Sequence, residues 1–251
     1  MSIFKHNKMF TLYFLRWLLR VSILLVVLWI YIFRPELMSL FTEFKLFGDF
    51  TPVTLLWAAL MLTMIVHMLP VSRHPMGTRK SLSATYREPE GSYDRLELLE
   101  YVQRMNIRAW RVMLVWLIFN GIFGLCYLAK WIGEEELILL SIFYYAGDVT
   151  CIIMFCPFQT FIMKSHCCVS CRIFDWGWFM MFTPMLFIRS FFSWSLFFTS
   201  CVVLIRWEVI YARHPERFWR GSNAAIRCEN CQDRICRIKK PLRNALGDKT
   251  E

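Results

Sequence analysis

Six apolar runs, separated by short charged stretches, limit the folds open to this chain more than any other feature. A helix that spans a bilayer needs about 20 mostly apolar residues. Hydrophobic residues make up 57% of the chain, and their concentration in long runs is the pattern of a membrane protein. The sequence therefore predicts an all-α integral membrane protein, a bundle of transmembrane helices. The runs are 21–33 with its extension back through 10–19, 52–71, 112–129, 137–163, 174–188 and 191–205.

The last two runs are short, and they leave two alternatives. They form either two helices joined at Arg189 and Ser190, or one helix over 178–205. The distribution of basic residues favours the hairpin, because six crossings with both termini inside put 25 of the 29 Lys and Arg on one side. Basic loops are retained on the cytosolic side, whereas five crossings would put the basic tail outside. The inner segments would be 1–20, 72–111, 164–172 and 206–251.

We therefore expect a multi-pass protein of about six transmembrane helices in a bacterial cytoplasmic membrane, with both termini cytosolic. Residues 1–212 would form the bundle. Its cytosolic loop 72–111 would carry an amphipathic helix, capped by Asp94, that lies against the bundle or the inner leaflet. Other membrane or cytosolic proteins could bind through this loop. Residues 213–251 would form a Cys-rich basic tail that pairs with the loop 164–172.

The net charge of +10 is accounted for by these basic loops. No nucleic-acid-binding motif accompanies the charge, so the lipid bilayer is the expected partner and nucleic acid is not. The sequence also contains no P-loop, no HExxH motif, no nucleophile elbow and no dinucleotide-binding fingerprint. These absences argue against the common nucleotide-driven and hydrolytic chemistries. They leave open whether the chain is an enzyme.

Two C-x-x-C pairs provide the strongest chemical signal. Cys168 and Cys171 form the first pair, and Cys228 and Cys231 form the second. With six crossings, one hairpin separates the pairs and returns the chain to the same face. Because the cytosol keeps thiols reduced, paired cysteines there are more often metal ligands or redox centres than disulfides. Four thiolates suit a structural zinc ion, with an iron ion or iron–sulfur cluster as the alternative, and Cys236 is the substitute ligand.

A second group of polar residues lies inside the apolar runs. Asp148 is near the midpoint of the fourth run, and Cys151 and Cys156 share its helix face. Asn120 in the third run is the expected hydrogen-bond partner of Asp148. A carboxylate at this depth is either a polar clamp between two helices or part of a proton or ion pathway. Pro157 is expected to kink the fourth helix.

The second run carries His67 beside three methionines, Met61, Met64 and Met68. Soft thioethers with a histidine suit Cu(I). Methionine is also a common filler in helix packing. The sequence leaves both interpretations open.

Three classes of function follow from these features. The first is a membrane scaffold, assembly factor or metal-handling protein with a four-cysteine metal site on its cytosolic face. The second is a membrane electron-transfer protein or thiol–disulfide oxidoreductase that uses an iron–sulfur cluster or cysteine pairs. The third is a transporter of a soft metal. The substrate, if there is one, is not specified by these features.

The topology generates the first testable prediction. Reporter domains fused at Glu251 should report the cytosol, and reporters inserted after Ser190 should report the outside, because the positive-inside rule assigns the basic segments to the cytosol. The measurement is the activity of a compartment-specific reporter in intact cells. A reporter at Glu251 that is active outside the cell would contradict the six-crossing arrangement.

Overall fold

The computed structural model describes residues 8–34, 36, 52–69, 83–91, 93–165 and 171–230. Within these ranges the regular secondary structure is helical, with no β-strand. The described α-helices are α1 (Lys8–Phe33), α3 (Pro52–Met68), α5 (Arg95–Leu128), α6 (Glu134–Ile153), α7 (Gly177–Phe182) and α8 (Phe191–Arg213). A π-helix, η3 (Phe158–Met163), follows α6. The short 3₁₀ segments are η2 (Ser83–Thr85), η5 (Phe174–Trp176), η6 (Thr183–Phe187), η7 (Pro215–Phe218), η8 (Ala224–Ile226) and η9 (Cys228–Asn230).

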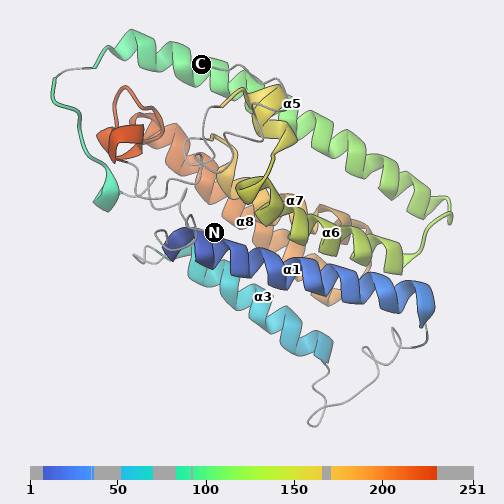
Figure 1. Ribbon diagram of the computed structural model, residues 1–251. Coiled ribbons are helices and arrows are strands. Elements are labelled where there is room, and N and C mark those ends of the chain that lie inside the picture. The colour runs from blue at the N-terminus through green and yellow to red at the C-terminus, as the bar shows by residue number, and fades with distance from the viewer. Residues whose placement is uncertain are drawn as a thin grey trace.

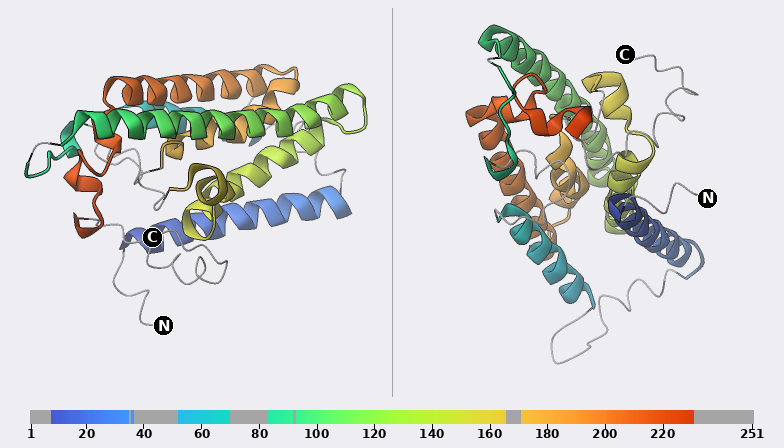
Figure 2. Two further views of the ribbon diagram at one scale, coloured as in Figure 1. Left: turned by 90° about the horizontal axis from the view of Figure 1, so that it is seen from above. Right: turned by 60° about the vertical axis from the view of Figure 1, so that its left-hand side comes forward.

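The long helices lie side by side in an elongated bundle, with α5 along one edge and α1 and α3 along the other (Figure 1). α1 packs on α6, α3 packs on α8, and α7 contacts both α6 and α8. One end of the bundle holds the starts of α1 and α5 and the end of α8 (left in Figure 1). Residues 215–230, which we call the cap, lie at this end (Figures 1 and 2). We therefore call it the cap end. We call the opposite end, where α6 and α8 begin, the hairpin end.

Four helices are long and apolar enough to cross a membrane: Thr11–Phe33 within α1, α5, α6 and α8. α3 is also apolar but shorter. Many large apolar side chains on these helices are exposed, among them Leu15, Leu25, Leu114, Ile118 and Val202. Lipid is the environment that such surfaces require, since exposed apolar surface of this extent is rare on soluble monomers. The expectation of an all-α membrane protein is therefore confirmed at the level of four candidate spans.

Two of the long helices differ from the apolar runs that predicted them. α5 is one continuous helix of 34 residues. The amphipathic helix expected in the loop 72–111 is therefore the first half of the helix that contains the third apolar run, and not a separate element. Its start is as expected, because the Asp94 carboxylate accepts a hydrogen bond from Leu96 N at 2.8 Å. The fourth run breaks instead of continuing. α6 ends at Ile153 and η3 begins after Pro157, consistent with the loss of a backbone donor at proline.

The last two runs form a hairpin, so the alternative of one helix over 178–205 is wrong. η5, α7 and η6 follow one another as the first arm, and α8 is the second arm. The turn lies at the expected position, where Ser190 N donates to Ile188 O at 2.9 Å. The first arm is central in the bundle and packs on α5, α6 and α8. Its side chains fill the main apolar cluster, which includes Phe179, Met181, Phe182 and Met185.

Close approach of the first arm to α5 depends on a glycine. A Cβ atom built on Gly124 would lie 2.3 Å from the Cε1 and Cζ atoms of the Phe187 ring, closer than any van der Waals contact allows. About two turns earlier in α5, Trp116 Nε1 donates to Thr183 Oγ1 at 3.0 Å. The two interactions hold α5 against η6 at the depth of the apolar cluster.

This contact generates the second prediction. Gly124→Ala should destabilise the protein by roughly 1–3 kcal/mol, because the added methyl group overpacks the Phe187 site. Gly121→Ala, one turn earlier in α5, is the matched control, since nothing lies within 4 Å of a Cβ there. The control should be neutral or stabilising by up to about 1 kcal/mol through helix propensity. Thermal unfolding in detergent measures both, and equal effects of the two substitutions would contradict the proposed packing role.

Candidate functional site

Among the described residues, three ion pairs join different parts of the chain in the half of the bundle nearer the cap end. They join Arg20 to Asp148, His67 to Asp175, and Arg172 to Glu208. The first pair lies well within the apolar length of its helices. Arg20 is 13 residues before the end of α1, and Asp148 is 14 residues after the start of α6. At 1.5 Å per residue both are about 20 Å from the hairpin end, inside a hydrocarbon core of about 30 Å. The assignment of Arg20 to the inner segment 1–20 is therefore wrong, because the candidate span of α1 begins at Thr11.

The pair of Arg20 and Asp148 fastens α1 to α6. Arg20 Nη1 donates to Asp148 Oδ2 at 2.8 Å and to Tyr145 O at 2.9 Å. The guanidinium also lies 4.0 Å from the centroid of the Tyr145 ring. A third element approaches the carboxylate, because a Cβ atom on Gly177 would be 2.7 Å from Asp148 Oδ1. The Asp148 side chain, which is 34% exposed, thus contacts α1 through one carboxylate oxygen and the start of α7 through the other.

Asn120 is not the partner of Asp148, so that expectation is wrong. Its side chain is 1% exposed; its Oδ1 accepts from Tyr144 OH at 3.2 Å and its Nδ2 donates to Trp116 O at 3.0 Å. Asn120 therefore links α5 to α6 through Tyr144, one turn before Asp148. Helical spacing on one helix cannot specify which residue of a neighbouring helix is opposite, and the sequence argument depended on that assignment.

The two cysteines that share the Asp148 face have different surroundings. Cys151 is half-buried in the last turn of α6. Cys156 lies beyond that helix, in the break before η3, where its Sγ accepts from Gln159 N at 3.4 Å. The helix break therefore separates Cys156 from the regular face that the sequence pattern assumed.

His67, the penultimate residue of α3, pairs with a carboxylate. His67 Nε2 lies 3.2 Å from Asp175 Oδ2, and the two side chains are 10% and 7% exposed. Arg206 Nη1 reaches the His67 carbonyl at 3.4 Å. Met64 is completely buried in the main apolar cluster, against which Met61 and Met68 pack. The contacts of the three methionines are those expected of side chains that fill space between packed helices.

The third pair is the most extensively bonded. Arg172 donates to both carboxylate oxygens of Glu208, and Trp176 Nε1 donates to Glu208 Oε1 at 2.8 Å. Trp207 Nε1 donates to the Arg172 carbonyl at 2.8 Å. The Arg172 guanidinium lies 3.6 Å from the centroid of the Tyr211 ring. Bidentate pairing and stacking are the contacts for which arginine, rather than lysine, is suited.

The cysteines of the two C-x-x-C pairs are only partly described. Cys171 is buried in a cluster with Tyr211 and Phe218, and Cys228 is exposed in η9. Cys168, Cys231 and Cys236 lie outside the described residues. Within the described ranges, no three side chains of His, Cys, Asp or Glu gather closely enough to hold a metal ion.

The cap has a polar core of its own. Asn223 is fully buried; its Nδ2 donates to Arg217 O at 2.7 Å and its Oδ1 accepts from Ala225 N at 3.0 Å. Ala224 N donates to Arg87 O at 2.8 Å, and Tyr101 OH reaches Phe218 O at 3.5 Å. The cap therefore binds both the segment before α5 and α5 itself.

Comparison with protein-family models, with curated proteins and with solved structures finds no match for this chain. The chemical capacity of the site must be judged from its geometry. Each of the carboxylates Asp148, Asp175 and Glu208 faces a basic side chain from another element. Each ion pair therefore connects two separate parts of the chain.

The pair of Arg20 and Asp148, which lies farthest along its helices from the cap end, generates the third prediction. Arg20→Gln and Asp148→Asn should each lower the melting temperature, because each substitution leaves the remaining charge without its counterion in apolar surroundings. The double variant should lose less than the sum of the two, with a coupling of roughly 0.5–3 kcal/mol. Thermal unfolding of the four proteins in detergent measures the coupling. Strictly additive losses would show that the two charges do not depend on each other.

Proposed function

We propose that this chain is a polytopic membrane scaffold or assembly protein whose cap end is closed by a thiolate-bound metal ion. The ligands would be Cys168, Cys171, Cys228 and Cys231, with Cys236 as the substitute, and the ion would be zinc. One observation carries the proposal. Cys171 is buried in one apolar cluster with Phe218, a residue of the cap that precedes Cys228 by ten positions.

The packing of the cap supports a site shared between the two C-x-x-C pairs. Tyr211 at the end of α8 and Phe218 in η7 have ring centroids 4.9 Å apart, so the chain turns back as it leaves α8. Cys171 belongs to the same cluster. Four thiolates around one tetrahedral ion would then fasten the first arm of the hairpin to the tail. The binding energy of the metal would add to the folding energy of this end.

The scaffold class is supported by the ion pairs. Arg20 with Asp148, His67 with Asp175 and Arg172 with Glu208 each join two elements, which stabilises one arrangement of helices. A surface for partners is also present, since Leu96 and Leu99 near the start of α5 are 70% and 62% exposed. Partners that assemble at the cap end would meet this surface.

The proposal includes six crossings, with both termini on the cytosolic side of a bacterial membrane. It is supported by the common position of the start of α1, the start of α5, the end of α8 and the cap at one end of the bundle (Figure 1). The described parts of the basic segments lie largely at this end, and the positive-inside rule would assign that end to the cytosol.

Metal analysis provides the fourth prediction. Purified protein should contain one tightly bound, colourless zinc ion per chain. Cys171→Ser and Cys228→Ser should each lower both the zinc content and the melting temperature, because three thiolates hold the ion less tightly than four. The measurements are elemental analysis by mass spectrometry and thermal unfolding, with and without a chelator.

Two other cysteines provide matched controls. Cys126, in α5 towards the hairpin end, and Cys201, in α8, lie outside both C-x-x-C pairs. Cys126→Ser and Cys201→Ser should leave the zinc content unchanged. Unaltered zinc content in Cys171→Ser and Cys228→Ser would refute the shared site. A brown chromophore would instead favour an iron–sulfur cluster, and labile copper would favour a soft-metal transporter.

A further inference from the structure

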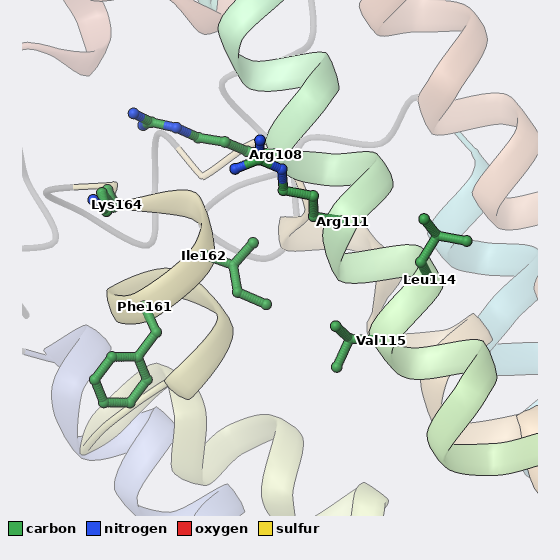
Figure 3. A pocket seen from close by; sticks show the side chains of 7 residues that line it. All are labelled: Arg108, Arg111, Leu114, Val115, Phe161, Ile162 and Lys164. Atoms are coloured by element: carbon green, nitrogen blue, oxygen red, sulfur yellow. The ribbon is translucent and has the colours of Figure 1, made fainter. Parts of the chain in front are cut away.

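An open groove of about 570 Å³ lies between α5 and the π-helix η3. It is formed where the chain breaks after α6, because η3 then crosses to α5 and packs on it. Figure 3 shows the side chains that line it. They are Arg108, Arg111, Leu114, Val115, Phe161, Ile162 and Lys164.

The basic side chains gather at one end of the groove (Figure 3). Arg108 and Arg111 come from α5, and Lys164 comes from the opposite wall, directly after η3. Arg108 Nη1 also donates to Met163 O at 2.8 Å, which joins the two walls. Within the described parts of the chain, no acidic side chain lines the groove and none pairs with these three cations. This end of the groove therefore offers uncompensated positive charge to an anion.

The rest of the groove is apolar. Four apolar side chains line it, Leu114 and Val115 from α5 and Phe161 and Ile162 from η3. In Figure 3, Val115 and Ile162 point toward each other below the cations, whereas Leu114 and Phe161 project outward from the two helices. Phe161 is 69% exposed and Leu114 is 57% exposed, so neither side chain is covered by the rest of the protein. A ligand that uses the whole groove must have an anionic end and a long apolar part.

The position of the groove along α5 matches the boundary of a bilayer. The charged residues of α5 end at Arg111, and no charged residue follows before the helix ends at Leu128. From Arg111 to Leu128 the helix extends about 26 Å, close to the thickness of the hydrocarbon core. The three cations thus lie at the level of the headgroups, and the apolar walls lie at the level of the acyl chains.

Lys164 is held at this place by its backbone. Its φ of 48° is in the left-handed region, which is uncommon for a residue with a side chain. This conformation ends η3, and Lys164 N donates to Gln159 O. The end of the π-helix thereby brings a cation to the wall opposite Arg108 and Arg111.

We infer that this groove binds an anionic phospholipid. Arg111 and Lys164, with Arg108 beside them, contact the phosphate, and Leu114, Val115, Phe161 and Ile162 contact the acyl chains. A free phosphate ion would leave the apolar walls exposed. A zwitterionic lipid would bring a quaternary amine against three cations. The groove contains none of the C-x-x-C cysteines, so this inference goes beyond the proposed metal site and does not depend on it.

Lipid titration of the full-length protein in a neutral detergent tests the inference. Phosphatidylglycerol should bind roughly tenfold more tightly than phosphatidylcholine, as expected if the three cations act on the headgroup. Bound lipid is counted by native mass spectrometry, and the rise in melting temperature is recorded in parallel. Arg111→Gln and Lys164→Gln should each weaken phosphatidylglycerol binding by about fivefold and weaken phosphatidylcholine binding less, so that the preference between the two lipids falls. Both side chains are exposed, so the folded state should not be affected.

Controls separate the groove from a general charge effect. Arg213→Gln removes an exposed cation of α8 at the same end of the bundle and should not alter the preference. Phe161→Gln should weaken the binding of phosphatidylglycerol by removing an apolar wall. Equal affinity for the two lipids in the wild-type protein, or equal losses in Arg213→Gln and Arg111→Gln, would overturn the inference. Glycerol 3-phosphate that competes as strongly as the lipid would overturn it in favour of a site for free phosphate. Loss of zinc in a cysteine variant with the lipid preference intact would separate the two sites.

Discussion

The cost of placing charge in apolar surroundings is the constraint on which this arrangement of helices depends. An ionised side chain inside a bilayer is stable only with a counterion or hydrogen bonds near it. Arg20 lies where α1 is otherwise apolar, and Asp148 supplies its counterion from α6. Arg172 and Glu208 pair in the same way, and Trp176 Nε1 donates a further hydrogen bond to the Glu208 carboxylate. Because each charge lies on a different element from its partner, meeting the electrostatic requirement also fixes which elements are neighbours.

Packing around the first arm of the hairpin makes these pairs possible. Two glycines allow the arm to approach its neighbours closely: Gly124 admits the Phe187 ring, and Gly177 admits the carboxylate of Asp148. At Gly177, close packing and charge pairing depend on the same residue, because a side chain there would displace the Asp148 carboxylate that pairs with Arg20. The close packing of the arm and the pairing of charges are therefore one structural condition, and neither can change without the other.

The parts of the fold that depend on local sequence could be predicted, and the parts that depend on contacts between helices could not. Arg189 and Ser190 identified the turn of the hairpin, Asp94 identified a helix start, and Pro157 identified a break. Each of these is a property of a few consecutive residues. The partner of Asp148 could not be found in this way, because periodicity gives the face of a helix and not its neighbour. The one signal available was Arg20 itself, a charge inside an apolar run. The four-cysteine site remains a prediction, since Cys168, Cys231 and Cys236 lie outside the described residues.

The continuity of α5 has a mechanical consequence. The helix is 34 residues long, or about 50 Å, whereas the hydrocarbon core is about 30 Å thick. Roughly 20 Å of rigid rod therefore extends past the membrane surface, ending at the exposed Leu96 and Leu99. A sideways force applied there acts on a rigid helix that is held at its other end, where Phe187 packs on Gly124. Because α5 is one continuous helix, torque applied there is transmitted to the contact of Gly124 with Phe187, near the hairpin end of the bundle.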